Sequence, residues 1–189
     1  MHADNWAIRA KQEGFRTRAV YKLDEIVNKT KVLNKKQYVL DLGSAPGGWS
    51  QYVKKKSPLS EVFAIDILNM EALDGVHFFQ QSIEEIDRIE AINILREKFG
   101  LVISDIAPNL TGINAIDVEN IYELNSLTLE TANKYLNKSN GSFIMKTFQN
   151  NMLKNLRKKM ELSFKIVQTF KPAASKKQSG EIYLYGAYK

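Results

Sequence analysis

The chain has 189 residues, of which 44% are hydrophobic and 25% charged, so we expect an ordinary globular protein with a single domain over residues 1–189. It contains no cysteine, which excludes disulfides, thiolate zinc sites and a cysteine nucleophile. No apolar run approaches the ~18 residues of a membrane span, and the first residues do not form a signal peptide, so we expect a cytoplasmic protein without a membrane partner.

Positive charge is concentrated at the two ends of the chain. The net charge is +6, and residues 1–36, the basic N-terminal segment, hold nine Lys and Arg against four Asp and Glu. Residues 131–189 hold twelve against two, whereas residues 66–130 hold three against thirteen. If the two ends meet in the fold, they form a cationic face that suits a phosphate backbone; the alternative is an ordinary solvated surface.

The chain begins with a predicted helical region. Residues 4–30 carry apolar side chains at helical spacing, and Gly14 is expected to break the region into two helices. The short apolar run at residues 37–43 predicts a buried strand, and the glycine-rich turn that follows it opens a helix at residues 47–56. Another apolar run, at residues 61–67, predicts the second strand.

The middle of the chain continues this alternation. A third strand is predicted at residues 76–82, and the period of residues 84–98 predicts a helix. Residues 101–109 predict a strand that is stopped by Pro108, and residues 117–137 predict a long amphipathic helix. Strands that alternate with helices are typical of βαβ units in a mainly parallel sheet.

The last part of the chain adds three strands and one helix. A strand is predicted at residues 141–148, a basic helix at residues 150–161, and two strands at residues 164–172 and 181–189. Because no helix separates the last two strands, they should pair antiparallel. We therefore predict an α/β fold with a mainly parallel seven-stranded sheet, an antiparallel last strand and helices on both faces.

The first predicted strand ends in a glycine-rich turn, "DLGSAPGGWSQ", at residues 41–51. Gly43, Gly47 and Gly48 allow a sharp turn and a close approach of the backbone to a ligand. The second strand ends in Asp66, about 20 residues further on, where a carboxylate can accept both hydroxyls of a ribose. Together these features predict a site for a nucleoside-bearing cofactor, although a tight structural turn could use the same glycines.

We expect this cofactor to be a cation rather than a dinucleotide. The turn lacks the G-x-G-x-x-G pattern with which a pyrophosphate is bound at a helix N-terminus. Asp41, Asp66 and Asp105 all fall at strand ends on one edge of the predicted sheet. An acid-rich pocket of this kind suits the sulfonium and amino-acid tail of S-adenosyl-L-methionine, so a methyltransferase is favoured over a dehydrogenase.

A lysine interrupts the apolar strand at residues 141–148. A buried lysine is costly unless it is paired, and Lys146 lies near the carboxyl end of its strand, on the edge that holds Asp105. Glu181 opens the last strand, which runs the opposite way and so begins at that edge, and Lys22 of the N-terminal region could join them. Each residue alone could be a surface charge or a structural ion pair, but together at a cofactor site they predict a catalytic centre.

Five motifs carry a resemblance to a known family. In chain order they are "FRTRAVYKLDEI", "DLGSAPGGWSQ", "SDIAPNLTG", "FIMKTFQ" and "KPAASKKQSGEIYLY". Over nearly its whole length the chain resembles the FtsJ/RrmJ family of ribosomal RNA large-subunit 2′-O-methyltransferases, a branch of the Rossmann-like, S-adenosylmethionine-dependent methyltransferases. The resemblance implies methylation of a ribose 2′-hydroxyl, at a uridine, in ribosomal RNA of the large ribosomal subunit. We also expect a monomer with no metal site.

The resemblance also implies roles for individual residues. The family's catalytic Lys-Asp-Lys-Glu tetrad falls on Lys22, Asp105, Lys146 and Glu181, and the second lysine is the proton acceptor. The expected cofactor-binding residues are Asp41, Gly43, Gly47, Gly48, Trp49, Asp66, Ser82 and Asp105. Ser82 departs from the family, which usually has an adenine-binding aspartate there. Because serine carries no charge, we expect lower cofactor affinity unless a neighbouring group substitutes.

The implied reaction removes the proton of a 2′-hydroxyl, a group that RNA has and DNA lacks. A lysine can accept this proton only as a neutral amine. For Lys146, burial and the nearby cation of Lys22 favour the neutral form, whereas Asp105 and Glu181 favour the ammonium. The residues leave a second mechanism open, in which Lys146 stays charged and stabilises the forming alkoxide.

RNA contacts are expected from basic residues of the N-terminal segment and of the loop before the last strand. The candidates are Arg9, Lys11, Arg16, Arg18, Lys171, Lys176 and Lys177. Phosphate contacts of this kind give salt-dependent affinity with little sequence choice. Phe15 and Tyr21 could stack on bases, although such residues are more often part of a core.

Other functions share parts of this pattern. The tetrad also occurs in enzymes that methylate tRNA or the mRNA cap, but 189 residues leave little room for a cap pocket. A tRNA 2′-O-methyltransferase therefore remains an alternative. A second alternative is a non-catalytic RNA-binding factor of ribosome assembly on the same fold; the intact tetrad argues against it, and Ser82 argues for it.

Overall fold

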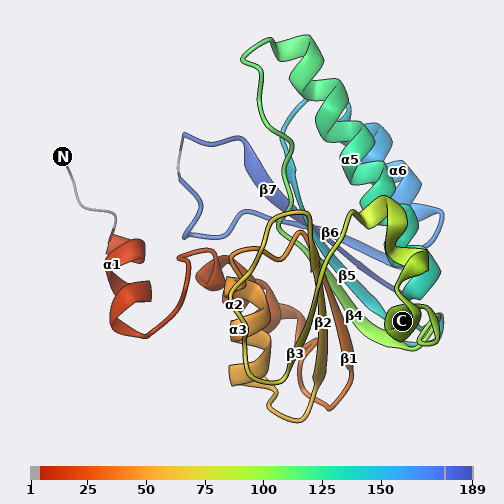
Figure 1. Cartoon of the computed structure of the whole chain (residues 1–189). Helices are drawn as coiled ribbons and strands as arrows, with labels where there is room; N and C mark the ends of the chain where they lie inside the picture. Colours follow the sequence, from red (N-terminus) through yellow and green to blue (C-terminus); the bar gives the residue numbers. More distant parts are fainter. Residues whose placement is uncertain (1–4, 177, 189) are drawn as a thin grey trace.

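A seven-stranded sheet forms the centre of the computed structural model, which describes residues 5–176 and 178–188 (Figure 1). The strands lie in the order β3-β2-β1-β4-β5-β7-β6. Their bounds are β1 (Tyr38–Leu42), β2 (Glu61–Asp66), β3 (Val76–Gln80), β4 (Phe99–Ser104), β5 (Ser142–Phe148), β6 (Ile166–Phe170) and β7 (Glu181–Ala187). Strands β1 to β5 pair in parallel, and β7 pairs antiparallel with both β5 and β6, which confirms the predicted fold class.

Helices cover both faces of this sheet. Their bounds are α1 (Asn5–Gln12), α2 (Val20–Thr30), α3 (Gly48–Lys56), the 3₁₀ helix η1 (Ile83–Arg88), α4 (Glu90–Asn93), α5 (Asn114–Tyr135) and α6 (Leu153–Glu161). Helices α2 and α3 lie on one face, and α5 and α6 lie on the other (Figure 1). Among the described residues, no helix is both long and apolar enough to cross a membrane.

Successive side chains of each strand point to opposite faces, and this alternation decides which residues meet α2 and α3. On β5, Ile144 packs into the core that α2 and α3 cover, whereas Phe143 and Met145 pack into the core beneath α5 and α6. On β7, Tyr183 and Tyr185 share the face of Ile144. Residues at the carboxyl edge that continue this alternation therefore point toward α2.

The predicted helix at residues 84–98 was wrong. The structure has η1 and the single-turn α4 instead, separated by Ile89 in an extended conformation with φ −87° and ψ 95°. The isoleucines at residues 83, 86, 89 and 92 recur every three residues, and all pack into the core beneath α5 and α6. A spacing of three suits the 3.0-residue turn of a 3₁₀ helix, so the same apolar pattern is satisfied without a long α-helix.

Candidate active site

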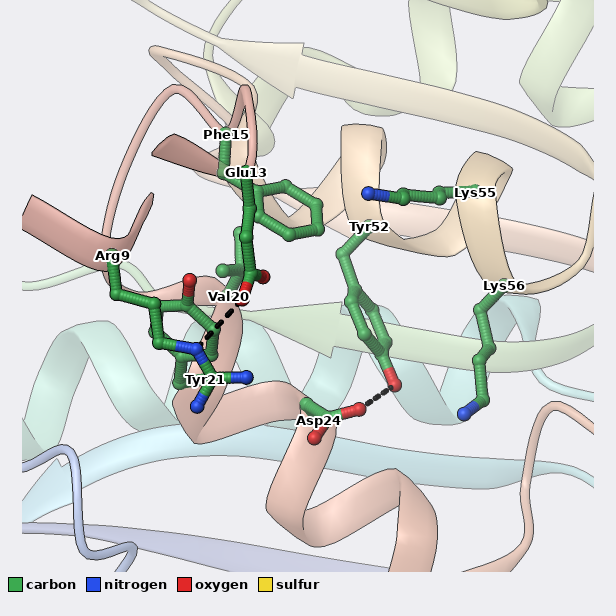
Figure 2. A pocket seen from close by; sticks show the side chains of 9 residues that line it. All are labelled: Arg9, Glu13, Phe15, Val20, Tyr21, Asp24, Tyr52, Lys55 and Lys56. Carbon is green, nitrogen blue, oxygen red and sulfur yellow. Dashed lines mark hydrogen bonds and ion pairs between the residues drawn. The ribbon is translucent and has the colours of Figure 1, made fainter. Parts of the chain in front are cut away.

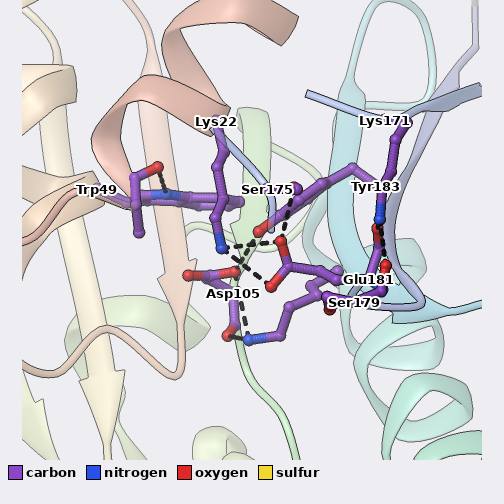
Figure 3. A network of polar contacts seen from close by, with 10 residues as sticks. Lys22, Trp49, Asp105, Lys171, Ser175, Ser179, Glu181 and Tyr183 are labelled. Atoms are coloured by element: carbon purple, nitrogen blue, oxygen red, sulfur yellow. Dashed lines mark hydrogen bonds and ion pairs between the residues drawn. The ribbon is translucent and has the colours of Figure 1, made fainter. Parts of the chain in front are cut away.

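Strand alternation and strand direction bring four charged side chains together at the carboxyl edge of the sheet. Lys146 follows Ile144 on the face of α2 and α3, and Glu181 precedes Tyr183 on the same face of the antiparallel β7. Lys22 reaches them from the buried side of α2. Figure 3 shows Lys22, Asp105 and Glu181 converging on one point from three separate elements. The structure therefore assembles the tetrad that the sequence predicted, although the roles of its members stay predictions.

Lys22 and Glu181 form a close, largely buried ion pair. The Lys22 Nζ lies 2.8 Å from Oε1 and 2.9 Å from Oε2 of Glu181, and the two side chains are only 9% and 14% exposed. The Ser175 hydroxyl donates to Oε1 at 2.8 Å. Burial alone would raise the pKa of Glu181, but the hydrogen bonds and charge of Lys22, with smaller contributions from Ser175 and Lys146, hold it below its ordinary value.

This depressed pKa predicts a specific loss of stability in acid. A carboxylate whose pKa is lowered by folding stabilises the protein above its unfolded pKa, and the stabilisation is lost as the pH falls through the folded pKa. We therefore expect the free energy of unfolding of the wild type to fall more steeply below about pH 4.5 than that of Glu181→Gln. Urea unfolding of both proteins at a series of acidic pH values measures this, and parallel curves would contradict it.

Lys146 is paired with Asp105. Its Nζ lies 3.3 Å from Oδ1 of Asp105 and also donates to the backbone carbonyl of Asp105. The pairing of Ser104 with Met145 in the sheet register places the next two residues side by side, which explains why these side chains meet. The Lys146 side chain is 12% exposed and that of Asp105 is 23% exposed, so both can reach a ligand at this edge.

Tyr183 joins the cluster, and the sequence analysis missed it. Its hydroxyl donates to Oδ1 of Asp105 at 2.7 Å, and its ring packs against Trp49 with 5.7 Å between the ring centroids. Burial, followed by the negative charges of Asp105 and Glu181, raises the pKa of Tyr183, so the phenol stays a donor. The available signal was its position two residues after Glu181, which places it on the same face of the strand.

The predicted cofactor turn forms a small cavity beside this cluster. The cavity has a volume of about 100 Å³ and is lined by Thr17, Ala19, Asp41, Gly43, Ser44, Ala45, Pro46, Gly48, Trp49 and Asp105. Gly43 and Gly47 have φ angles of +75° and +101°, in the left-handed region. The indole of Trp49 donates to the carbonyl of Ala19 at 2.9 Å, which ties α3 to the start of α2 beside the cavity.

Asp41 supplies a buried carboxyl to the wall of this cavity. Burial raises the pKa of Asp41 to about 7. The hydrogen bond from Ser50, 2.6 Å long, opposes this rise, and the negative charges of Asp105 and Asp66 add to it. A cation that binds next to Asp41 would favour the ionised form of this carboxyl, so the wall is suited to a positively charged ligand.

Asp66 and Ser82 lie at the carboxyl ends of β2 and β3, as predicted. The carboxylate of Asp66 accepts the backbone N–H groups of Ala45 at 2.9 Å and Leu68 at 2.8 Å, which fixes its orientation. An ionised carboxylate has about four lone-pair positions, so acceptor capacity remains for ribose hydroxyls. Ser82 caps η1 by accepting the N–H of Glu84 at 3.3 Å.

A side chain at residue 43 should be tolerated poorly. A Cβ at Gly43 would lie 2.7 Å from the Cβ of Ile106, and the left-handed φ adds strain. We expect Gly43→Ala to lower the free energy of unfolding by about 2–4 kcal/mol. Gly112→Ala is the matched control, because Gly112 has φ +83° with no atom within 4 Å, and strain alone should cost about 1–2 kcal/mol. If denaturant unfolding shows equal losses of unfolding free energy for Gly43→Ala and Gly112→Ala, the expected clash with Ile106 is contradicted.

Two of the predicted RNA-binding residues are engaged in the fold. The guanidinium of Arg16 donates to the backbone carbonyls of Pro46 and Glu71, both at 2.8 Å, and of Ala72 at 3.0 Å, so it ties the cofactor turn to the segment after β2. The Lys171 Nζ donates to the carbonyl of Glu181 at 2.6 Å. These contacts give both residues a structural role, and their predicted contacts with RNA stay predictions.

The remaining RNA candidates differ in environment. Lys11 and Lys176 are exposed, and Arg18 is half-buried. Arg9 is exposed and lies over the ring of Tyr21. Lys177 lies outside the described residues. Within the described part of the chain, no group of three or more His, Asp or Glu side chains is arranged to hold a metal ion.

The sheet and its helices are those of a Rossmann-like methyltransferase. A ribosomal RNA methyltransferase from Plasmodium falciparum has a similar crystal structure, with a TM-score of 0.77 and 28% identity over 92% of this chain and 97% of that one. Human methyltransferase-like protein 13, solved with SAH, has a TM-score of 0.62 at 13% identity over 84% of this chain and 75% of that one, which is a likeness of fold alone.

The chain belongs to the FtsJ-like methyltransferase family, whose model matches residues 15–189. It is 40% identical to ribosomal RNA large subunit methyltransferase E of Dechloromonas aromatica over 97% of this chain and 90% of that protein. The protein of the same name from Neisseria gonorrhoeae is 41% identical over 98% of this chain and 91% of its own length. The family resemblance that the five motifs carried is thereby confirmed.

The cofactor is S-adenosyl-L-methionine, and the residues present fit it. The carboxylates of Asp41 and Asp105 line the cavity and match a ligand with a sulfonium and an ammonium group. The hydroxyl of Ser44 is buried on the cavity wall and has no hydrogen-bond partner among the described residues. It would be satisfied by the carboxylate of the amino-acid tail, while Asp66 would hold the ribose.

Proposed function

We propose that this protein methylates a ribose 2′-hydroxyl, at a uridine, in ribosomal RNA of the large ribosomal subunit. The proposal is supported by family membership and by relatives that are named ribosomal RNA large subunit methyltransferases. The observation that carries it is the paired cluster of two lysines and two carboxylates beside the cofactor cavity. In this proposal the protein acts in the cytoplasm as a monomeric, single-domain enzyme without a metal.

Each side chain of the cluster has a separate role in removing the proton of the 2′-hydroxyl. When bound, S-adenosyl-L-methionine supplies an electrophilic methyl group on a sulfonium. The amine of Lys146 accepts the proton of the 2′-hydroxyl as the ribose oxygen attacks. Asp105 holds the Lys146 side chain at the cavity, and the hydroxyl of Tyr183 fixes the orientation of Asp105.

Lys22 adds a fixed positive charge to this arrangement. Its ion pair with Glu181 keeps the ammonium in place beside the cluster. The same charge stabilises the negative charge that develops on the ribose oxygen. Positioning of the hydroxyl against the methyl group supplies a further large part of the rate.

The experiment is transfer of labelled methyl from S-adenosyl-L-methionine to large ribosomal subunits isolated from cells that lack this enzyme. Matched tRNA and the Lys146→Ala protein run beside it. We expect label in large-subunit RNA, at a single ribose that then resists alkaline cleavage, and none with Lys146→Ala. Label in tRNA alone would overturn the substrate and keep the chemistry. If no RNA is labelled although the cofactor binds, the enzymatic proposal fails in favour of an RNA-binding factor.

A further inference from the structure

A second cavity lies between the N-terminal helices and α3, outside the site described above. It has a volume of about 220 Å³ and is lined by Arg9, Glu13, Phe15, Val20, Tyr21, Asp24, Tyr52, Lys55 and Lys56. Figure 2 shows Arg9 and Tyr21 against each other on one side, and Tyr52, Lys55 and Lys56 on the opposite side. None of these residues belongs to the tetrad or to the cofactor turn, so the cavity is a separate feature of the fold.

One wall of this cavity offers flat surfaces for stacking. The guanidinium of Arg9 lies over the ring of Tyr21, with 4.6 Å from its central carbon to the ring centroid. The Arg9 side chain is 55% exposed, so part of its planar group can be reached by a ligand, while its Nε donates to Glu13 at 2.7 Å and its central carbon lies 5.8 Å from the ring centroid of Trp6. Aromatic rings and arginine planes are the surfaces on which unpaired bases stack in RNA-binding proteins.

The opposite wall offers cations. The Nζ of Lys55 lies 4.5 Å from the ring centroid of Phe15, and the Nζ of Lys56 donates to the side chain of Asn28 at 3.3 Å. Both ammonium groups therefore lie at the cavity on the last turn of α3, where they can meet a phosphate. Stacking surfaces on one side and cations on the other match the two ends of a nucleotide.

Polar groups between the walls can recognise a base edge. The hydroxyl of Tyr21 is buried, the residue being 7% exposed, and it makes no well-formed hydrogen bond among the described residues, although the carboxylate of Glu13 interacts with it. The carboxylates of Glu13 and Asp24 line the same space, and Asp24 accepts the hydroxyl of Tyr52 at 2.8 Å. Carboxylates accept the amino and imino hydrogens of bases, and a buried hydroxyl without a well-formed hydrogen bond can pair with a polar atom of a base.

The position of the cavity relative to the tetrad follows from α2 and α3. On α2, Lys22 points to Glu181, whereas its neighbours Tyr21 and Asp24 line the cavity. On α3, Trp49 lines the cofactor cavity, and Tyr52, about one turn further on, lines this one. The two sites are therefore neighbours along α2 and α3, close enough for a few nucleotides of one RNA strand to reach both.

We propose that this cavity binds an unpaired nucleotide of the substrate RNA, a few positions from the methylated ribose, with its base against Arg9 and Tyr21 and its phosphate on Lys55 and Lys56. The inference deepens the proposed function and rests on RNA being the substrate. It assigns RNA contacts to α3, where the sequence predicted no RNA-binding residue. It also gives the aromatic residues of the N-terminal segment a role in addition to packing.

The test is direct binding of a fluorescein-labelled, single-stranded decaribonucleotide to the full chain, measured by anisotropy without methyl transfer. We expect Lys55→Ala/Lys56→Ala to weaken binding by about tenfold or more, because two phosphate contacts are lost. Lys158→Ala/Lys159→Ala is the matched control, since it removes two adjacent lysines from α6 on the other face of the sheet. This control should leave the affinity nearly unchanged, and equal losses in the two double variants would overturn the proposal.

A third variant separates stacking from charge. Arg9→Lys keeps the positive charge and removes the planar group, so we expect a loss of about fivefold or more if a base stacks there. Photocrosslinking of the same RNA with a 4-thiouridine should label the peptides that contain Tyr21 or Tyr52. If the wild type methylates ribosomal RNA but none of these variants changes the affinity for the RNA strand, this inference alone is wrong. Absence of methyl transfer to any RNA would instead remove the proposed function.

Discussion

A Lys146→Ala protein should transfer methyl groups about a thousandfold more slowly than the wild type, because the group that accepts the 2′-hydroxyl proton is gone. Lys146 pairs with Asp105 at the edge of the cofactor cavity and is not among the residues that line the cavity. The affinity for S-adenosylhomocysteine should therefore stay nearly unchanged. Single-turnover kinetics measure the first quantity, and isothermal titration calorimetry measures the second.

Lys146→Arg decides between the two mechanisms that the sequence left open. Arginine keeps a positive charge but does not give up its proton, so it cannot act as a base. If Lys146 accepts the proton, the arginine variant should be about as slow as Lys146→Ala. If the lysine only stabilises the alkoxide by its charge, the arginine variant should retain much of the activity.

Two control measurements test whether the effect of Lys146→Ala is specific to the amine. Lys165→Ala removes an exposed lysine far along the chain and should leave the rate unchanged, which controls for the loss of one positive charge. Thermal unfolding of Lys146→Ala shows whether the fold persists. If cofactor affinity falls as much as turnover in a folded Lys146→Ala protein, the lysine is structural and the proposed base is wrong.

The second large effect is expected from the Lys22–Glu181 pair. Lys22→Met leaves Glu181 buried without its cation, and breaking a buried pair in this way should cost about 3 kcal/mol of the free energy of unfolding. The double variant Lys22→Met/Glu181→Gln removes both charges and keeps a hydrogen-bonding group opposite Ser175. It should therefore recover most of the lost stability.

Activity should behave differently from stability in the same series. The double variant has no fixed cation beside Lys146, so its methyl transfer should remain as slow as that of Lys22→Met. Lys29→Met is the matched control, because Lys29 pairs with Glu25 on the same helix with 57% of its side chain exposed, and it should cost less than about 1 kcal/mol. If the losses of unfolding free energy in Lys22→Met and Glu181→Gln simply add in the double variant, the two side chains are not energetically coupled and the prediction is wrong.

The position of the tetrad could be predicted because strand direction and alternation are local rules. Asp105 follows a parallel strand, Lys146 lies near the end of the next one, and Glu181 begins a strand that runs the other way. These facts place all three at one edge without knowledge of the packing. The structure adds which charges pair, namely Lys146 with Asp105 and Lys22 with Glu181.

Other features depend on packing between distant segments and could not be predicted. The structural role of Arg16 is one example, because the sequence pattern shows only its charge, whereas the carbonyls that it contacts come from residues 46, 71 and 72. In the sequence, Tyr183 is one of several aromatic residues in an apolar strand, and only the structure shows that its hydroxyl donates to Asp105. The three-residue spacing of the isoleucines in and beside η1 and α4 is compatible with an α-helix and with a 3₁₀ helix. Which of the two forms depends on packing against the sheet.

The location of β7 has a consequence for how the protein is made. β7 is the last strand of the chain, yet it lies inside the sheet between β5 and β6 and pairs with both. It also carries Glu181, whose partner Lys22 is 159 residues earlier. During synthesis β5 and β6 emerge before the strand that joins them, and Lys22 stays without its carboxylate partner until Glu181 has left the ribosome. The active site is thus completed only after β7 has been made, so a chain that stops short of β7 lacks both a closed sheet and a paired Lys22.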